Sequence, residues 1–227
     1  MAVKVLYHGH SCLEIFSGEQ VIQLDPFYDS SPLSDVKSDK PNPQTILLSH
    51  AHFDHVDDAE RIARRTGALI AATYEIAAWY EKKGLKVAHM NTGGGRAFAF
   101  GRATLVQALH TSTFPDGSPG GLPGGWIIET GGKVIYFAGD TALFGDMALF
   151  GKLWQIDLAC LPIGDNFTMG PDHAVLAAEM LQAKCVLPIH YNTFPPIQQD
   201  PAAFAAKLAA KHIKCAALKP GQSLDMS

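Results

Sequence analysis

The segment His50-Ala51-His52-Phe53-Asp54-His55 places four side chains that can bind metal within six consecutive positions. It directly follows Thr45-Ile46-Leu47-Leu48-Ser49, an apolar run that predicts a fully buried strand. Because side chains at i and i+2 of an extended chain point the same way, His50 and His52 can bind one ion together. Asp54 and His55 follow where the chain turns and can reach a second ion. The segment therefore predicts a metal site at the end of a buried strand.

The ligand types narrow the choice of metal. Imidazole together with carboxylate favours Zn²⁺, Mn²⁺ or Fe²⁺ over Ca²⁺ or Mg²⁺. The alternative is an exposed histidine-rich turn that binds no ion, but the compact mixture of histidine with aspartate beside an apolar strand favours the metal site. We expect two divalent ions, Zn²⁺ first, with Mn²⁺ and Fe²⁺ as alternatives that the sequence does not separate.

Two ions need more ligands than this cluster offers, and three further candidates occur elsewhere in the chain. Each comes where an apolar run ends and a polar loop begins; they are His110, Asp140 and His190. Functional groups are common at such strand ends in sheet-based folds. A single histidine there is more often structural, yet three such residues beside the cluster favour metal ligands. Asp140 can bridge two ions through its two carboxylate oxygens.

The rest of the chain alternates short apolar runs with amphipathic segments and Gly- and Pro-rich loops. We expect strands at 3–7, 13–16, 21–24, 45–49, 68–72, 158–163, 186–189 and 215–218, and near residues 87, 98, 105, 127 and 135. We expect helices at 58–65, from an N-cap at 73 to about 83, and after the Pro residues at 171 and 201, with loops at 29–43 and 113–125. The pattern of strands and helices is similar in the two halves of the chain, which fits two sheets packed face to face with helices outside. We expect a single domain spanning 1–227. Periodicity alone does not separate this arrangement from other α/β folds.

Composition limits the class of protein. The chain has 227 residues, of which 47% are hydrophobic, with no apolar run near the roughly 20 residues that cross a bilayer. The first residues show no signal-peptide pattern, so we expect a cytoplasmic protein without a membrane partner. The net charge is −4 and the cations form no basic tract, which weighs against nucleic acid. We therefore expect a small-molecule substrate; a homo-oligomer is compatible with the sequence, which leaves the oligomeric state open.

The cysteines and the remaining histidines indicate less about function. The four cysteines lie far apart without a Cys-x-x-Cys pair, which argues against a zinc ribbon or a dithiol redox site and favours free thiols. Three histidines lack a comparable context and are expected to be structural or solvated; they are His8, His89 and His212.

These motifs together resemble the metallo-β-lactamase superfamily, and within it the small bacterial and archaeal proteins called UPF0173 metal-dependent hydrolases. The likeness covers essentially the whole chain and rests on the segments 9–12, 24–27, 50–55, 138–147, 161–171 and 190–195. The resemblance implies a four-layer αββα sandwich of the α/β (α+β) class, with the metals at one edge of the two sheets.

The resemblance also implies how the seven ligands divide between the metals. It assigns one metal to His50, His52 and His110. It assigns the other to Asp54, His55 and His190, with Asp140 bridging the two.

Further residues are candidates for supporting roles. The resemblance places His10 and Asp25 near the metals, where Asp25 would accept a hydrogen bond from a ligand histidine and His10 would donate to the substrate or leaving group. The alternative for both is a structural hydrogen bond in a turn. Asp54 and His10 are thus the candidate catalytic residues. Asp165 and Asn192 lie beside segments typical of the family and are candidate pocket residues.

The expected activity is hydrolysis by a metal-bound hydroxide at a dinuclear site. A metal ion lowers the pKa of coordinated water from about 15.7 towards 7, so that a nucleophile exists at neutral pH. The bond cleaved would be an ester, lactone, amide or phosphodiester, and one alternative is specifically a phosphodiesterase. Another is a non-catalytic metal-binding or scaffold protein that keeps the fold, against which the complete ligand set weighs. The sequence does not name the substrate.

Overall fold

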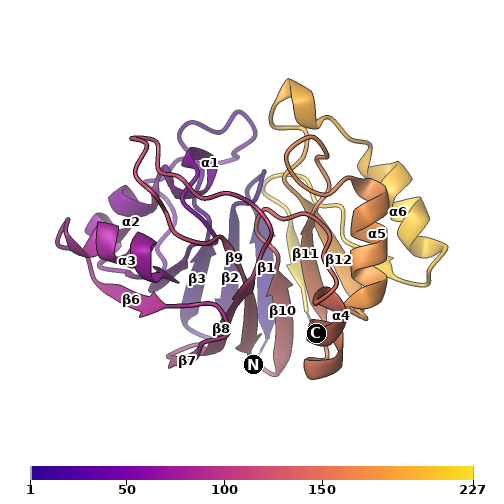
Figure 1. The fold of residues 1–227 in the computed structure, drawn as a ribbon, viewed down its shortest axis with the longest axis horizontal. Coiled ribbons are helices and arrows are strands. Elements are labelled where there is room, and N and C mark those ends of the chain that lie inside the picture. Colours follow the sequence, from indigo (N-terminus) through magenta and orange to yellow (C-terminus); the bar gives the residue numbers. More distant parts are fainter. Residues whose placement is uncertain (1, 227) are drawn as a thin grey trace.

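A computed structural model describes residues 2–226 and contains two seven-stranded sheets that pack face to face (Figure 1). In spatial order the first sheet consists of β14 (Ser223–Asp225), β1 (Val3–Tyr7), β2 (Leu13–Ser17), β3 (Gln20–Leu24), β4 (Thr45–Leu47), β5 (Leu69–Thr73) and β6 (Val87–Met90). The second consists of β13 (Lys214–Cys215), β12 (Cys185–Ile189), β11 (Leu158–Pro162), β10 (Lys133–Phe137), β9 (Gly124–Thr130), β8 (Gly101–Gln107) and β7 (Gly95–Phe98).

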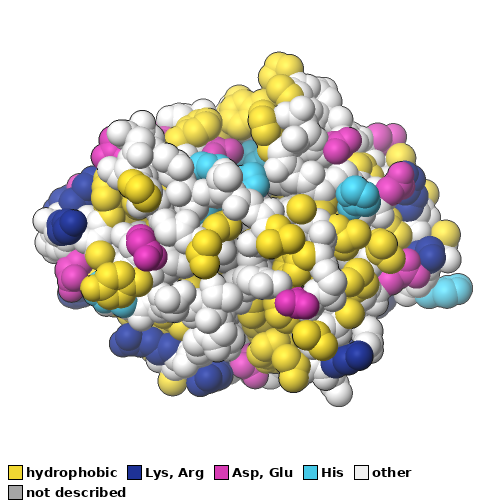
Figure 2. All heavy atoms as spheres, in the orientation of Figure 1, with side chains coloured by type: hydrophobic (Ala, Val, Ile, Leu, Met, Phe, Trp, Pro, Cys, Tyr) yellow, Lys and Arg dark blue, Asp and Glu magenta, His cyan; other side chains and the backbone are white. Residues whose placement is uncertain are grey.

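Strand direction brings distant parts of the chain to one edge. In the first sheet β1, β2 and β3 are antiparallel to one another in turn, and β3 to β6 are parallel. In the second sheet β8, β9 and β10 alternate in the same way, and β10 to β13 are parallel. Two antiparallel steps restore direction, so β1 runs with β3 and β4, and β8 runs with β10 and β12. Figure 2 shows histidine side chains gathered at the upper edge of the molecule.

Helices cover the outer face of each sheet. Beside the first sheet lie α1 (Phe53–Val56), α2 (Ala59–Thr66) and α3 (Tyr74–Glu81). Beside the second lie α4 (Met147–Leu153), α5 (Pro171–Met180) and α6 (Pro201–Ala209), with a short 3₁₀ turn, η1 (Pro195–Ile197), before α6. The expected αββα sandwich is therefore confirmed. No helix within residues 2–226 has the length and apolar character needed to span a bilayer.

The core between the sheets follows from the two-residue period of strands. In β9, Trp126 and Ile128 face the core between the sheets, whereas Ile127 faces the helices outside. Both faces of the strand are thus buried, which explains its continuous apolar sequence. The Trp126 indole also donates to the Leu48 carbonyl at 3.1 Å, a direct link from the second sheet to the chain just after β4.

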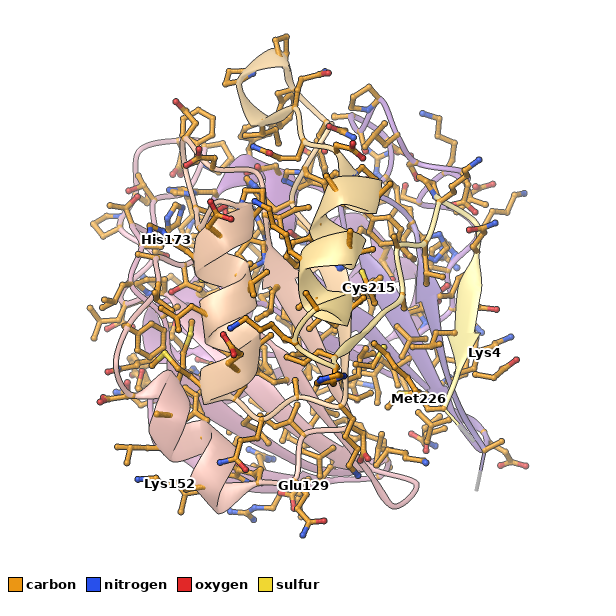
Figure 3. All side chains as sticks on the ribbon, turned by 90° about the vertical axis from the view of Figure 1, so that its right-hand side faces the viewer. Lys4, Glu129, Lys152, His173, Cys215 and Met226 are labelled. Atoms are coloured by element: carbon orange, nitrogen blue, oxygen red, sulfur yellow. The ribbon has the colours of Figure 1, made fainter. Side chains whose placement is uncertain are left out.

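Several expected elements are wrong in detail. The expected strand at 215–218 is reduced to β13, and the chain then crosses to the other sheet, where β14 pairs with β1 beside Lys4 (Figure 3). β14 was not expected, because its three residues, Ser-Leu-Asp, are too few to show a strand pattern in the sequence. The helices α1 and α4 were also not expected, and β9 begins at Gly124, inside the expected loop.

Two smaller expectations concern side chains. Thr73 does occupy the N-cap position of α3, but its hydroxyl donates to the Gly120 carbonyl instead of capping the helix. This bond ties β5 to the loop after β8, so the threonine serves tertiary structure. All four cysteines are free, as expected.

Candidate metal centre

The strand ends at one edge carry all seven candidate ligands. The loop after β4 and the start of α1 carry His50, His52, Asp54 and His55. The loops after β8, β10 and β12 carry His110, Asp140 and His190. Since these strands run in the same direction, the structure brings all seven together between the two sheets.

One group of nitrogen atoms belongs to three histidines. His50, His52 and His110 each offer a ring nitrogen, and these atoms lie within 4.8 Å of one another. His50 Nε2 lies 3.0 Å from His52 Nδ1. Three imidazole nitrogens directed at one point form a donor set that suits Zn²⁺ and similar ions.

A second group lies beside the first. His10, Asp54, His55 and His190 each offer one ligand atom within 4.8 Å of the others. Three of the four form the set that the resemblance implies for one metal, and His10 is added by position. Imidazole with one carboxylate is again a set suited to transition metals.

Asp140 lies between the two groups. Its Oδ2 atom is 3.6 Å from His110 Nε2 and 3.9 Å from His50 Nε2, both in the first group. The same oxygen is 2.9 Å from His190 Nε2, and Oδ1 is 3.4 Å from His55 Nε2, both in the second group. This position gives one carboxylate access to both groups.

Unpartnered buried atoms test whether cations fit here. His55 Nε2 and Asp140 Oδ1 are buried and lack a hydrogen-bond partner among residues 2–226. A buried polar atom without a partner costs about 1–3 kcal/mol, and native proteins seldom leave one unexplained. Both atoms belong to the convergent donor set, so the residues present fit bound divalent cations.

The protonation states of the candidate ligand histidines differ between the two groups. Burial and the neighbouring histidines lower the pKa of His50, His52 and His110, although Asp140 opposes this, so these rings are neutral and their nitrogens can bind a cation. Burial also acts to lower the pKa of His190, but Asp140 and Asp54 outweigh it and raise the pKa to about 9. The same balance raises the pKa of His55. Protons on these two rings therefore occupy positions that cations would take.

Asp25 lies behind the second group. The side chain is fully buried, and its Oδ2 atom accepts the hydrogen bond from His55 Nδ1 at 2.7 Å that the sequence led us to expect. The Ser49 amide donates to Asp25 Oδ1 at 2.8 Å. Since Nδ1 of His55 is held in this way, its Nε2 is the atom left to face Asp140.

His10 has a different position from the one expected. Its side chain is fully buried and does not line the cavity, so a direct proton donation from His10 to substrate does not fit this geometry. His10 Nε2 lies 2.9 Å from Asp54 Oδ2, and Nδ1 lies 2.7 Å from the Thr193 hydroxyl. Burial and the nearby His190 lower the pKa of His10 to about 4. The ring is thus neutral, donating to Asp54 and accepting from Thr193, which was not singled out from the sequence.

Asp165 and Asn192 do not line the cavity either. Asp165 is exposed at a turn, and its backbone amide donates to the Met169 carbonyl at 3.0 Å. Asn192 Oδ1 accepts from the Gln199 amide at 2.7 Å. Both backbones lie in the left-handed region, with φ of 61° and 60°, which Asp and Asn tolerate better than most residues. The geometry gives both residues a role in shaping loops.

The candidate ligands open into a cavity of about 540 Å³. Five of its lining side chains are candidate ligands: His52, Asp54, His110, Asp140 and His190. The others are Phe53, Thr111, Thr113, Pro115, Phe167, Phe194 and Pro196. The three phenylalanines were not singled out from the sequence; two of them lie in loops, where no periodic pattern marks an aromatic residue.

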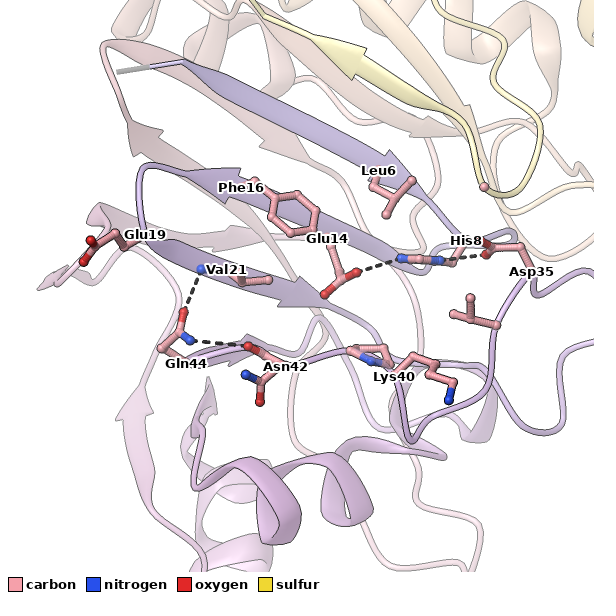
Figure 4. Close-up of a pocket in the computed structure, with 13 residues that line it drawn as sticks. Leu6, His8, Glu14, Phe16, Glu19, Val21, Asp35, Lys40, Asn42 and Gln44 are labelled. Carbon is pink, nitrogen blue, oxygen red and sulfur yellow. Dashed lines mark hydrogen bonds and ion pairs between the residues drawn. The ribbon is translucent and has the colours of Figure 1, made fainter.

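A second cavity, of about 520 Å³, lies against β1, β2 and β3 under the loop at 35–44 (Figure 4). The His8 ring is held there between Glu14, at 3.0 Å, and Asp35, at 2.7 Å. None of the seven candidate ligands lines this cavity. His8 is therefore a buried structural residue, as expected.

Known proteins share both the sequence and the fold. A family model described as a beta-lactamase superfamily domain matches residues 20–191. A UPF0173 metal-dependent hydrolase of Exiguobacterium is 47% identical over 227 residues, covering 99% of this chain and 100% of that protein. One from Thermus thermophilus is 47% identical and covers 99% of each chain. The solved structure of a metallo hydrolase from the archaeon Ignicoccus hospitalis is 36% identical with a TM-score of 0.92, covering 100% of this chain and 99% of that one.

Proposed function

The chain belongs to the beta-lactamase superfamily and, within it, to the UPF0173 metal-dependent hydrolases, and we propose that it hydrolyses a small molecule at a centre of two divalent metal ions. The observation that carries this proposal is the position of Asp140. Its carboxylate lies within 3.9 Å of histidines from both groups of candidate ligands. A single carboxylate so placed favours a shared two-metal site over two unrelated ones.

The proposed ligands divide into two sets joined by one residue. His50, His52 and His110 would hold the first ion. Asp54, His55 and His190 would hold the second, and Asp140 would contribute to both. Zn²⁺ is the ion proposed first, because the set is rich in imidazole.

The bound ions supply a nucleophile by lowering the pKa of water, and positive charge that offsets the charge developing on the reacting group. The chain's own residues hold this centre in place. Asp25 fixes the ring of His55, and the pair formed by His10 and Thr193 fixes the carboxylate of Asp54. The apolar wall of the cavity excludes water around a bound substrate.

The first test measures metal content and hydrolysis together. Protein purified without added metal is analysed by mass spectrometry for bound ions, then assayed on carboxyl esters, lactones, amides and phosphodiesters before and after chelation. We expect about two ions per chain and a hydrolytic activity that chelation abolishes and one metal restores. Metal binding without hydrolysis of any class would instead favour the scaffold alternative.

Asp140→Asn tests the shared carboxylate. The amide keeps the size of the side chain but removes the charge, so we expect metal content to fall from about two ions to one or fewer and activity to fall by at least about 100-fold. Asp172→Asn is the matched control, because Asp172 is exposed on α5 and pairs with Lys207. Full metal content and full activity in Asp140→Asn would contradict the two-metal centre.

A further inference from the structure

Three phenylalanines form much of the cavity wall beside the candidate ligands. Phe53 comes from α1, Phe167 from the loop after β11, and Phe194 from the loop after β12. Phe53 and Phe167 are 48% and 54% exposed, which is unusual for side chains of this size. Exposed aromatic residues that line one concave site mark a surface that binds an apolar group.

Two rings of the wall, those of Phe53 and Phe194, pack against a buried third phenylalanine and lie near each other. Phe27 is fully buried beneath the wall, and its ring centroid lies 5.8 Å from that of Phe53 and 6.5 Å from that of Phe194. The rings of Phe53 and Phe194 are themselves 6.2 Å apart. Because buried Phe27 supports both rings, a ligand would meet a positioned apolar surface.

The same cavity lacks lysine and arginine. Among the described residues that line it, none is Lys or Arg. The loop segments that surround it, 50–58, 109–123, 138–147, 163–171 and 190–200, also contain neither residue type. In the view of Figure 2, no Lys or Arg side chain lies beside the histidines at the upper edge. A carboxylate or phosphate carried by the substrate away from the metals would thus lie on an apolar wall without a partner, which is costly.

The side chains that line the cavity also limit the kind of leaving group that the substrate can have. Every titratable side chain that lines the cavity, among residues 2–226, belongs to the proposed ligand set. No other titratable side chain is there to protonate a departing amine, so an ester, whose alcohol leaving group needs less assistance, fits this cavity better than an amide.

Resting on the proposed hydrolase function, we propose that the substrate is a neutral carboxylic ester, open-chain or cyclic, whose apolar part lies against Phe53, Phe167 and Phe194. In the reaction the acyl C–O bond breaks. The oxygen of water forms the new bond to the acyl carbon, and its proton goes to the departing alcohol oxygen. No oxidant or reductant is needed.

Matched p-nitrophenyl substrates test the class. The hexanoate is neutral, and the adipate monoester has the same chain length with a terminal carboxylate. The hexanoic p-nitroanilide and bis(p-nitrophenyl) phosphate represent amides and phosphodiesters. With each kcat/KM divided by the spontaneous rate, we expect the hexanoate to exceed the adipate by at least about tenfold. From acetate to hexanoate we expect kcat/KM to rise, by up to roughly fourfold for each methylene buried.

Two variants test the residues. Phe167→Ala is expected to reduce kcat/KM for the hexanoate several-fold while leaving the acetate nearly unchanged, and Leu153→Ala, which alters a 69% exposed residue on α4, is the control. Thr113→Lys places a cation at the exposed part of the wall and is expected to raise activity on the adipate relative to the hexanoate.

A measurement without turnover complements these assays. We expect the metal-free protein to bind hexanophenone, a neutral ketone that it cannot hydrolyse, and Phe167→Ala to weaken this binding in calorimetry. Adipate or phosphodiester hydrolysis as fast as that of the hexanoate would overturn the substrate class while leaving the hydrolase function intact. With the ions bound, failure to hydrolyse any of the substrates would overturn both proposals.

Discussion

Asp25 holds His55 from behind: its Oδ2 atom accepts the Nδ1 proton of His55 at 2.7 Å, and both side chains are fully buried. This hydrogen bond determines which ring nitrogen of His55 is turned away from Asp25. His55 Nε2 is consequently directed toward Asp140 Oδ1 at 3.4 Å. Asp25 thus orients a histidine that is a candidate metal ligand.

Asp25→Asn is therefore expected to weaken metal binding. The amide keeps the shape of the side chain but loses the charge that orients and polarises His55, and such changes typically reduce affinity by about 10- to 100-fold. Competition with a fluorescent chelator measures the loss for each ion. The effect should fall on the ion assigned to Asp54, His55 and His190, and Asp172→Asn should leave both affinities unchanged. Equal affinities in Asp25→Asn and the parent protein would refute this role.

Thr193→Val tests the support of Asp54 through His10. Valine matches threonine in shape but removes the hydroxyl that donates to His10 Nδ1, so the ring loses the partner that fixes its tautomer. We expect kcat to fall by roughly tenfold with a smaller change in KM, because Asp54 is held less firmly. Thr193→Ser keeps the hydroxyl and should restore most of the activity. If Thr193→Val and Thr193→Ser have the same kcat, the hydrogen bond between Thr193 and His10 does not support catalysis.

Gly139→Ala tests how closely the two sheets approach at the centre. Gly139 directly precedes Asp140 and has a φ of 60°, and a Cβ there would lie 2.6 Å from the Ser49 Cβ. Since neither backbone can move freely, we expect a loss of roughly 2 kcal/mol in the free energy of unfolding and reduced metal content. Gly145→Ala is a suitable control, because a Cβ at that residue meets nothing within 4 Å. Urea unfolding of both variants measures the difference.

The stability of the protein should depend on His8 in a pH-dependent way. Burial lowers the pKa of His8, but hydrogen bonds and charge from Glu14 and Asp35 outweigh it, so the folded pKa is raised above 6.5. A raised pKa adds stability that is complete below 6.5 and is lost as the pH rises through the folded value. His8→Gln should therefore cost roughly 2 kcal/mol at pH 5.5 and less at pH 9, measured by urea unfolding of metal-free protein. A cost that rises with pH would show that His8 is neutral in the folded state.

The convergence of the candidate ligands could be predicted from the sequence because strand ends can be recognised locally. His110, Asp140 and His190 each follow an apolar run, and strands that share a direction bring such positions to one edge whatever their distance along the chain. Local patterns therefore sufficed for residues whose convergence follows from topology.

The sequence failed where a role depends on orientation. His10 was expected to face the substrate, but it is turned inward between Asp54 and Thr193. The aromatic wall was not foreseen, because Phe167 and Phe194 reach the centre through loops whose paths no periodicity describes. Loop conformation is set by tertiary contacts, so the cavity that selects the substrate is the part least accessible from sequence.

The pairing of β14 with β1 has a consequence for synthesis on the ribosome. The carbonyl groups of Tyr7 and Val3 accept hydrogen bonds from the chain around β14. However, all the other strands of both sheets are synthesised after β1 and before β14. Until β14 emerges, the outer side of β1 is an open edge with free backbone donors and acceptors, a template on which nascent chains can associate. Lys4, whose exposed charge lies on this strand, works against such association. A nascent chain that stalls before β14 would thus depend on this lysine, or on a chaperone, to remain unassociated.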